Sequence, residues 1–254
     1  MELSHVPLGS TGMRVAGLAL GTVKLGRSAG LKYPNAVRIP SDDEARQLLN
    51  AARALGINLI DTAPAYGNSE ARLGSLLKNE REHWLICTKV GEEFDGTTSH
   101  YDFTPEAVER SVLRSLTRLQ TDTLDIVLIH SDGADETILR EFGTLDALRD
   151  LKQRGLIRAV GMSHKSAAGA RAALAENVDV IMATLNREYV EETTVIENAA
   201  QRGCGVLIKK ALNSGHGSSD DLKFVAQQSG VHSIVVGTTN PQHLTANALA
   251  IAGQ

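Results

Sequence analysis

Short runs of apolar residues alternate along the chain with longer segments in which apolar residues recur every three or four positions. The clearest run, residues 57–60, ends abruptly at Asp61 and is followed by a turn that opens a helix, with Ser69 as the expected N-cap. Such runs are typical of buried strands, and the longer spacing is typical of helices that pack through one face. The pattern therefore predicts strands and helices in alternation.

This alternation repeats eight times along the sequence. The predicted strands span residues 15–23, 57–60, 84–89, 125–130, 157–162, 178–183, 205–209 and 233–236. The predicted helices span residues 42–56, 69–78, 104–119, 145–154, 165–175, 191–201, 220–228 and 241–252. Eight such units in 254 residues match the size of a closed parallel (β/α)8 TIM barrel, which is an α/β fold.

The competing architecture is an open doubly wound sheet. Such a sheet usually carries a glycine-rich dinucleotide loop after its first strand, and residues 19–23, Ala-Leu-Gly-Thr-Val, form no such loop. Residues 3–14 contain a turn at 7–12 and are predicted to form a small N-terminal β-hairpin outside the repeat. Because no linker or change of composition divides the chain, residues 1–254 are expected to form a single barrel domain.

Composition narrows the possible partners. The net charge of −4 argues against a nucleic-acid or anionic membrane surface. Cys87 and Cys204 are the only cysteines, too few for a disulfide framework or a metal site. No apolar run has transmembrane length and the N-terminus lacks a signal-peptide pattern. The expectation is a cytoplasmic protein with no metal, membrane or nucleic-acid partner; a monomer is compatible with the sequence, which says little about oligomeric state.

Four chemistry-bearing residues fall at the predicted strand ends. Asp61, Lys89 and His130 end the second, third and fourth strands, and Tyr66 lies on the loop after the second. Each residue alone has an ordinary structural explanation. Asp61 could be a turn residue, Lys89 could reach out to solvent, His130 could be a core histidine, and Tyr66 could pack within its loop. Since the active sites of such barrels lie at the C-terminal ends of the strands, the four together favour a catalytic site.

The four residue types suggest one kind of chemistry. A tyrosine has an ordinary pKa of about 10 and is a poor acid at neutral pH, but a nearby lysine ammonium lowers that pKa. Asp61 is expected to hold Lys89 charged and in place, while His130 donates a hydrogen bond to a carbonyl oxygen. This arrangement suits carbonyl reduction, in which hydride reaches carbon and Tyr66 protonates oxygen.

At these residues the chain resembles the aldo-keto reductase superfamily, as a short bacterial-type member, over essentially its whole length. The matching segments are residues 18–22 (LALGT), 57–74 (INLIDTAPAYGNSEARLG), 86–92 (ICTKVGE), 124–131 (LDIVLIHS), 155–163 (GLIRAVGMS) and 235–247 (VVGTTNPQHLTAN). The resemblance implies a (β/α)8 barrel that binds NAD(P)H in an extended form and reduces aldehydes or ketones. It also implies that Tyr66 is the general acid, that Lys89 and Asp61 tune it, and that His130 orients the carbonyl.

The resemblance further implies a set of cofactor-binding positions. They are Gly21, Thr22, Ser163, His164, Met182, Lys209, Ala211, Leu212, Ser214, Gly237, Thr238, His243 and Asn247. Ser163 matches the serine that holds the nicotinamide carboxamide, the group from Ala211 to Ser214 matches the pyrophosphate loop, and the group from Thr238 to Asn247 matches the adenosine-phosphate segment. NADPH is the expected cofactor, with NADH possible.

Several of these positions depart from the family pattern. His164 replaces a usual asparagine, Met182 a frequent glutamine, and Lys209 an aromatic residue that stacks on the nicotinamide in many members. Gly237 replaces a usual lysine and His243 a frequent arginine. The departures concern the affinity and choice of cofactor and leave the expected reaction class unchanged.

The substrate pocket is expected to be open, because the chain is short for this family. Three loops are predicted to shape it, residues 25–40, 91–103 and 131–137. Lys32, Tyr33 and Pro34 either overhang the barrel mouth or belong to a merely solvated loop. The side chains that could form apolar walls of the pocket, or instead pack within their own loop, are Phe94, His100, Tyr101 and Phe103.

Two other functions remain open on the sequence. Lys89 at a strand end is also how barrel aldolases place a Schiff-base nucleophile. The superfamily further includes redox-sensing accessory subunits that keep cofactor and tetrad and act through a partner protein.

Overall fold

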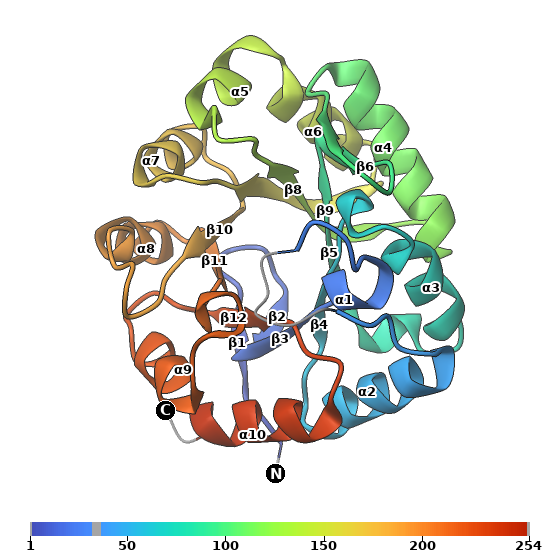
Figure 1. Ribbon diagram of the computed structural model, residues 1–254. Helices are drawn as coiled ribbons and strands as arrows, with labels where there is room; N and C mark the ends of the chain where they lie inside the picture. The colour runs from blue at the N-terminus through green and yellow to red at the C-terminus, as the bar shows by residue number, and fades with distance from the viewer. Residues whose placement is uncertain (1, 32–36, 253–254) are drawn as a thin grey trace.

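The computed structural model describes residues 2–31 and 37–252 and contains a closed parallel barrel with helices around it (Figure 1). The barrel strands are β3 (Leu18–Gly21), β4 (Leu59–Asp61), β5 (Leu85–Val90), β8 (Leu124–His130), β9 (Ile157–Ser163), β10 (Val180–Thr184), β11 (Gly205–Lys209) and β12 (Ser233–Val236). Each pairs in parallel with its sequence neighbour, and β12 closes the barrel by pairing with β3. The predicted (β/α)8 architecture is confirmed.

The helices form an outer ring that covers the strands. They are α1 (Val23–Gly26), α2 (Asp42–Ala54), α3 (Ser69–Leu76), α4 (Pro105–Leu119), α5 (Asp135–Glu141), α6 (Thr144–Gln153), α7 (Ala167–Ala175), α8 (Thr193–Gln201), α9 (Ser219–Ala226) and α10 (Pro241–Ile251). Short 3₁₀ turns occur at η1 (Pro64–Tyr66), η2 (Arg81–His83) and η3 (Asn213–Gly215). Within the described ranges, every helix is too short or too polar to cross a membrane.

Several helix starts follow the local capping chemistry. The side chain of Ser41 caps α2, and both Thr104 and Asn240 cap a helix whose first residue is proline. The prediction that Ser69 caps its helix is wrong. Asn68 takes the cap position, and Ser69 is the first residue of α3, fully buried, with its hydroxyl donating to Thr22 Oγ1 at 2.9 Å.

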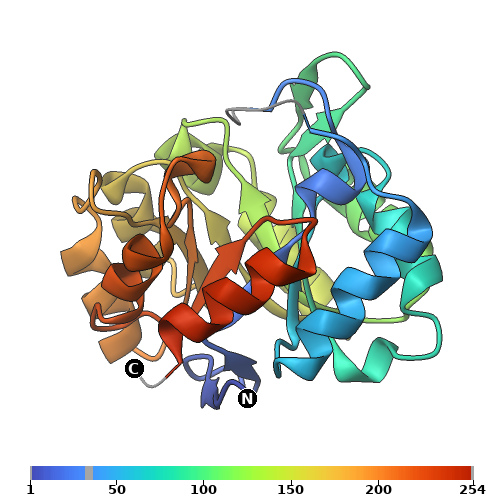
Figure 2. The ribbon, with the colours of Figure 1, turned by 60° about the horizontal axis from the view of Figure 1, so that its bottom comes forward.

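The barrel is closed at one end by the N-terminal hairpin, which Figure 2 shows below the strands. The hairpin consists of β1 (His5–Pro7) and β2 (Arg14–Ala16), and its turn buries Leu8 and Met13 in the barrel interior. At the turn, Gly9 has φ +52° and its Cα lies so close to Gly203 that a Cβ would meet the Gly203 carbonyl oxygen at 2.3 Å. Because this end is filled, the barrel opens only at the C-terminal ends of its strands.

The predicted first strand, residues 15–23, is wrong at both ends. Val15 and Ala16 pair with β1 in the hairpin, and Val23 begins α1. The apolar pattern is continuous through Gly17, so it conceals the point at which the chain leaves the hairpin and enters the barrel.

Two segments predicted as loops contain regular structure. Residues 92–101 form an antiparallel hairpin, β6 (Glu92–Phe94) and β7 (Ser99–Tyr101), which rises above the barrel mouth in Figure 2. The predicted loop at 131–137 runs into α5, which begins at Asp135. Both elements are short and carry charged residues at half-buried or exposed positions, so neither produces a clear apolar period.

Candidate active site

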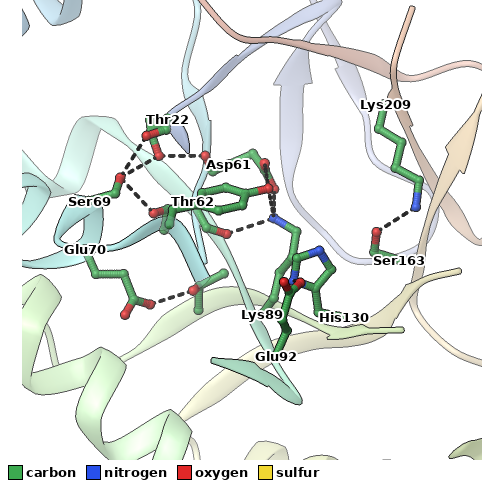
Figure 3. A network of polar contacts seen from close by, with 12 residues as sticks. Thr22, Asp61, Thr62, Ser69, Glu70, Lys89, Glu92, His130, Ser163 and Lys209 are labelled. Atoms are coloured by element: carbon green, nitrogen blue, oxygen red, sulfur yellow. Dashed lines mark hydrogen bonds and ion pairs between the residues drawn. The ribbon is translucent and has the colours of Figure 1, made fainter. Parts of the chain in front are cut away.

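Asp61, Tyr66, Lys89 and His130 meet at the open end of the barrel. Asp61 ends β4, Lys89 lies one residue before the end of β5, His130 ends β8 and Tyr66 ends η1. All four line one cavity of about 330 Å³ (Figure 3). The convergence expected from their places at strand ends is therefore present in the structure.

Lys89 is the centre of this group and is almost fully buried, at 1% exposure. Its Nζ donates to Asp61 Oδ1 at 2.5 Å, to the Thr62 carbonyl oxygen at 2.8 Å and to the Tyr66 hydroxyl at 3.2 Å. Burial alone lowers the pKa of Lys89, but the charge of Asp61 and the hydrogen bond to it contribute to raising that pKa overall. Lys89 is thus an ammonium with all three hydrogens engaged.

Tyr66 holds its proton firmly. Its hydroxyl lies 3.4 Å from Asp61 Oδ2, and burial together with the Asp61 charge raises the Tyr66 pKa, against the opposing effect of Lys89. Lys89 does lower this pKa, as expected, but desolvation of the phenolate dominates and the net shift is upward. Tyr66 is accordingly protonated at neutral pH, the form required of an acid.

His130 contacts a residue to which the sequence analysis gave no role. Its Nδ1 lies 2.9 Å from Glu92 Oε2, although the two are not aligned as a hydrogen bond, and its ring meets the Tyr66 ring edge-on at 6.3 Å between centroids. Burial lowers the pKa of His130 and Glu92 opposes this. Burial raises the pKa of Glu92, but His130, Ser99 and Arg27 outweigh it and bring that pKa to about 2.

Glu92 begins the β6–β7 hairpin, so this short element positions a carboxylate beside the tetrad. It lies within the ICTKVGE segment, directly after Gly91, which has φ +102°. Its place, three residues after Lys89, was the only sequence signal that could have identified it.

Six of the predicted cofactor positions line the same cavity as the tetrad. They are Gly21, Thr22, Ser163, Met182, Lys209 and Gly237. The Thr22 hydroxyl donates to the Asp61 carbonyl oxygen at 2.8 Å, so it braces β3 against β4 and points away from a ligand. The Lys209 ammonium donates to Ser163 Oγ at 2.9 Å, which Figure 3 shows apart from the Lys89–Asp61 pair.

Four more predicted positions line a second cavity of about 570 Å³. They are Leu212, Thr238, His243 and Asn247, and Gly237 lines both cavities. This second cavity lies at the start of α10, whose backbone N–H groups favour anions. Lys24 and Arg38, which the sequence analysis did not select, add two cations to its lining.

Three predicted positions do not line either cavity with a described side chain. The His164 ring is fully buried and its Nε2 lies 2.7 Å from Glu192 Oε2, so only its carbonyl oxygen, which accepts from Lys209, is turned toward the site. Ala211 is buried at 1% exposure, and Ser214 lies in η3. His164 therefore contributes backbone where the family usually offers an amide side chain.

The predicted aromatic wall is absent from the cavity of the tetrad. Phe94 lies under the Arg27 guanidinium, and Tyr101 stacks on the buried Phe103 at 6.1 Å between centroids. None of the four, His100 included, is among its described lining residues. From the loop at 25–40 only Leu31 lines this cavity in the described ranges, and Lys32, Tyr33 and Pro34 lie outside the described residues.

The pair of cavities fits an extended dinucleotide. They meet at Gly237, so one ligand can run from the tetrad to the start of α10. Cations line both ends: Lys209 in the first cavity, and Lys24 and Arg38 in the second. These features match a long anionic ligand with a redox-active end, as NAD(P)H is.

Comparison with known proteins identifies relatives of this chain. The sequence model of the Aldo/keto reductase family matches residues 17–220. A D-threo-aldose 1-dehydrogenase from Pseudomonas sp is 26% identical over 98% of this chain and 93% of its own length. An L-galactose dehydrogenase from Arabidopsis thaliana is 37% identical over 61% of this chain, but the match spans only 47% of that protein.

Solved structures show the same likeness. A crystal structure from Pseudomonas aeruginosa, of a protein assigned to the aldo-keto reductases, is 50% identical, covers 98% of this chain and 94% of that chain, and has a TM-score of 0.90. The holo form of an aldo-keto reductase from Bacillus halodurans is 22% identical, with a TM-score of 0.84 over 100% of this chain and 92% of that one, and shows the shared fold. The family match covers most of the chain and the barrel ends in the expected tetrad, so the chain belongs to the aldo/keto reductase family.

Proposed function

We propose that the chain is an NAD(P)H-dependent reductase of aldehydes or ketones, with NADPH as its main cofactor and Tyr66 as its general acid. The observation that carries the proposal is the contact of the Tyr66 hydroxyl with both Lys89 Nζ and Asp61 Oδ2 at the cavity wall. The bound cofactor supplies the hydride that reaches the carbonyl carbon. The side chains of the site supply the proton and orient the carbonyl group.

Tyr66 donates its proton to the carbonyl oxygen as negative charge develops there. Its raised pKa keeps the proton in place until a stronger base, the forming alkoxide, can accept it. The tyrosinate left behind lies 3.2 Å from the Lys89 ammonium, which stabilises it. Asp61 holds that ammonium through the 2.5 Å contact, so the three residues act as one proton-donating unit.

His130, which lines the cavity, holds the carbonyl oxygen through Nε2, the ring nitrogen that is not beside Glu92. A carboxylate only accepts hydrogen bonds, so Glu92 favours a proton on Nδ1. Nε2 then donates only when the ring is protonated, a form that Glu92 favours and burial opposes. This balance makes Glu92 the positioning residue of His130.

The Schiff-base alternative is not favoured by the geometry. A nucleophilic lysine needs a free lone pair, whereas Lys89 has a raised pKa and three engaged hydrogens. The accessory-subunit alternative stays a prediction, and turnover distinguishes it from a reductase. The cytoplasmic location is likewise part of the proposal, which two buried free thiols at Cys87 and Cys204 support.

The test is Tyr66→Phe, assayed by NADPH consumption on a panel of aldehydes, ketones, quinones and dicarbonyls. Loss of the general acid is expected to lower kcat by about 10²- to 10⁴-fold while the affinity for NADPH changes little. Tyr189→Phe is the matched control, since it removes a tyrosine hydroxyl outside both cavities. Tyr66 is not the acid if the variant keeps more than about a tenth of wild-type kcat with chemistry rate-limiting.

A further inference from the structure

Lys209 places a cation in the cavity without an acidic partner. It ends β11, and its Nζ reaches over β10 to the end of β9, where it donates to Ser163 Oγ and to the His164 carbonyl oxygen. The ion pairs of the described residues include none at Lys209, and the carboxylate of Glu192 is taken by His164. Among the described residues, Lys209 therefore has hydrogen-bond acceptors but no direct ion-pair partner.

The groups around Lys209 make its charge sensitive to pH. Burial and the neighbouring Lys210 lower its pKa, as does Lys89 on β5, while Glu192 before α8 and Asp135 on α5 oppose them. The net result is a pKa of about 7. Lys209 thus changes from ammonium to amine close to neutral pH.

This inference rests on the proposed function, which requires the nicotinamide ring to lie in the cavity that Lys209 and the tetrad both line. We propose that Lys209 discriminates between the two redox states of the cofactor, because its ammonium repels the positively charged oxidised ring and accepts the neutral reduced ring. The two rings have nearly the same shape and differ by one positive charge. Like charges in a partly dry cavity repel strongly, so Lys209 favours retention of NADPH and release of NADP⁺.

The discrimination depends on pH in a definite direction. At a pH below the Lys209 pKa the ammonium is present and NADP⁺ binds weakly. As pH rises through that pKa the amine forms, the repulsion disappears and NADP⁺ binds more tightly, whereas the affinity for NADPH changes less. The ratio of Kd for NADP⁺ to Kd for NADPH therefore falls as pH rises.

Isothermal titration of the purified full-length protein with NADPH and NADP⁺, from about pH 6 to about pH 9, measures this ratio. Because both nucleotides carry the same 2′-phosphate, pyrophosphate and adenine, the ionisation of those groups cancels in the ratio. The wild-type ratio is expected to fall about tenfold over the range, the effect of a one-unit difference in the Lys209 pKa between the two complexes.

Two variants separate charge from shape. Lys209→Met keeps the length of the side chain without charge, so its ratio is expected to be low and independent of pH. Lys209→Arg keeps a charge that does not titrate, so its ratio is expected to stay high throughout. The arginine variant also excludes other titratable groups of the cavity, such as His130, Lys165 and Lys210, as the source, since any of them would leave its ratio dependent on pH.

The matched control is Lys78→Met, which removes an exposed lysine that lines neither of the two cavities and is expected to behave as wild type. A wild-type ratio that is constant with pH and unchanged in Lys209→Met would overturn the inference. So would Lys209→Met affinities that weaken equally for both nucleotides, because that is the result of a structural role. Failure of either nucleotide to bind wild type would instead contradict the proposed function.

Discussion

At the scale of single residues, the site depends on how burial changes the protonation of each side chain. The residue types Asp, Tyr, Lys and His were enough to predict proton transfer to a carbonyl. The net shift of the Tyr66 pKa was predicted with the wrong sign, since sequence spacing shows that Lys89 is near but not that the phenol is deeply buried. Charge neighbours are visible in a sequence, and desolvation becomes visible only in the folded structure.

Glu92 shows the same limit for a contact between neighbouring strands. Its carboxylate meets His130, a residue 38 positions later in the chain, because Glu92 follows β5, which pairs with β8 (130 − 92 = 38). Sequence reasoning placed Glu92 in a loop and gave it no role. Nothing in its local pattern indicates which strand end the hairpin approaches.

Glu92→Gln tests the positioning role at this scale. The amide is nearly isosteric but uncharged, so it removes the main influence that favours the protonated ring, and the pKa of His130 is expected to fall further. At neutral pH fewer rings donate through Nε2, so kcat is expected to decrease by about tenfold. Because only the protonated ring donates, the fall of kcat with rising pH is expected to begin at a lower pH than in wild type.

NMR titration of labelled histidine measures the His130 midpoint directly. His5→Gln, which removes a ring at the closed end of the barrel, identifies another histidine signal without touching the site. An unchanged His130 midpoint in Glu92→Gln, together with an unchanged pH profile, would contradict the assignment of Glu92.

At the scale of elements, the barrel strands were predictable because each is a short apolar run with a polar or glycine-containing end. The β11 bounds, Gly205–Lys209, and the β12 bounds, Ser233–Val236, agree with the prediction at both ends. The elements that were missed, α1, α5 and the β6–β7 hairpin, are short segments in the connections that follow strand ends. Their form is set by tertiary contacts and not by periodicity.

In the second cavity, a cation from another element takes the place of basic residues that this chain lacks. Gly237 and His243 lack the lysine and arginine usual in the family, but Arg38, from the loop before α2, lines the same cavity as α10. Arg38 now forms an ion pair with Glu44 at 2.6 Å, on an exposed surface where such pairs contribute little. A 2′-phosphate in this cavity offers the guanidinium a stronger partner.

Arg38→Gln is therefore expected to weaken NADPH binding by about three- to tenfold and to leave NADH binding unchanged, because only NADPH carries the 2′-phosphate. Fluorescence or calorimetric titration with both cofactors measures the change. Arg46→Gln is the matched control, an exposed arginine on α2 paired with Asp43 and outside the cavity. If His243→Gln lowers the NADPH preference and Arg38→Gln does not, the phosphate contact belongs to α10 alone.

At the scale of the whole molecule, the fold gives an acidic protein a basic cavity. The net charge is −4, yet the cavity of the tetrad is lined by Lys89, Lys165, Lys209 and Lys210 against one carboxylate, Asp61. The N-terminal hairpin fills the opposite end, so all this charge collects at one opening. The total charge conceals a local excess of the other sign where the proposed anionic cofactor binds.

Holding Lys209 in this cavity has a cost in stability that depends on pH. Its pKa is about 7 in the folded protein and 10.5 for an ordinary lysine, so between these values the unfolded chain binds more protons than the folded one. Folding stability is therefore expected to fall as pH decreases from about 10.5 to about 7, and to change no further from this source below that. Lys209→Met removes this dependence, because methionine carries no proton in either state.

Urea denaturation of wild type and Lys209→Met at about pH 7 and about pH 10 gives the difference in unfolding free energy at each pH. The full shift of roughly 3.5 units corresponds to about 5 kcal/mol, and the access of water to the cavity reduces the expected change to about 2 kcal/mol. The variant loses the hydrogen bonds to Ser163 and the His164 carbonyl at both pH values, and any gain from methionine packing is likewise present at both. These two contributions therefore cancel when the two differences are compared. The unfolding free energy of Lys209→Met relative to wild type is thus expected to be about 2 kcal/mol higher at about pH 7 than at about pH 10. For Lys78→Met this difference is expected to be the same at both pH values. An equal difference at both pH values would mean that Lys209 keeps an ordinary pKa, because only a group whose proton affinity changes on folding can link stability to pH.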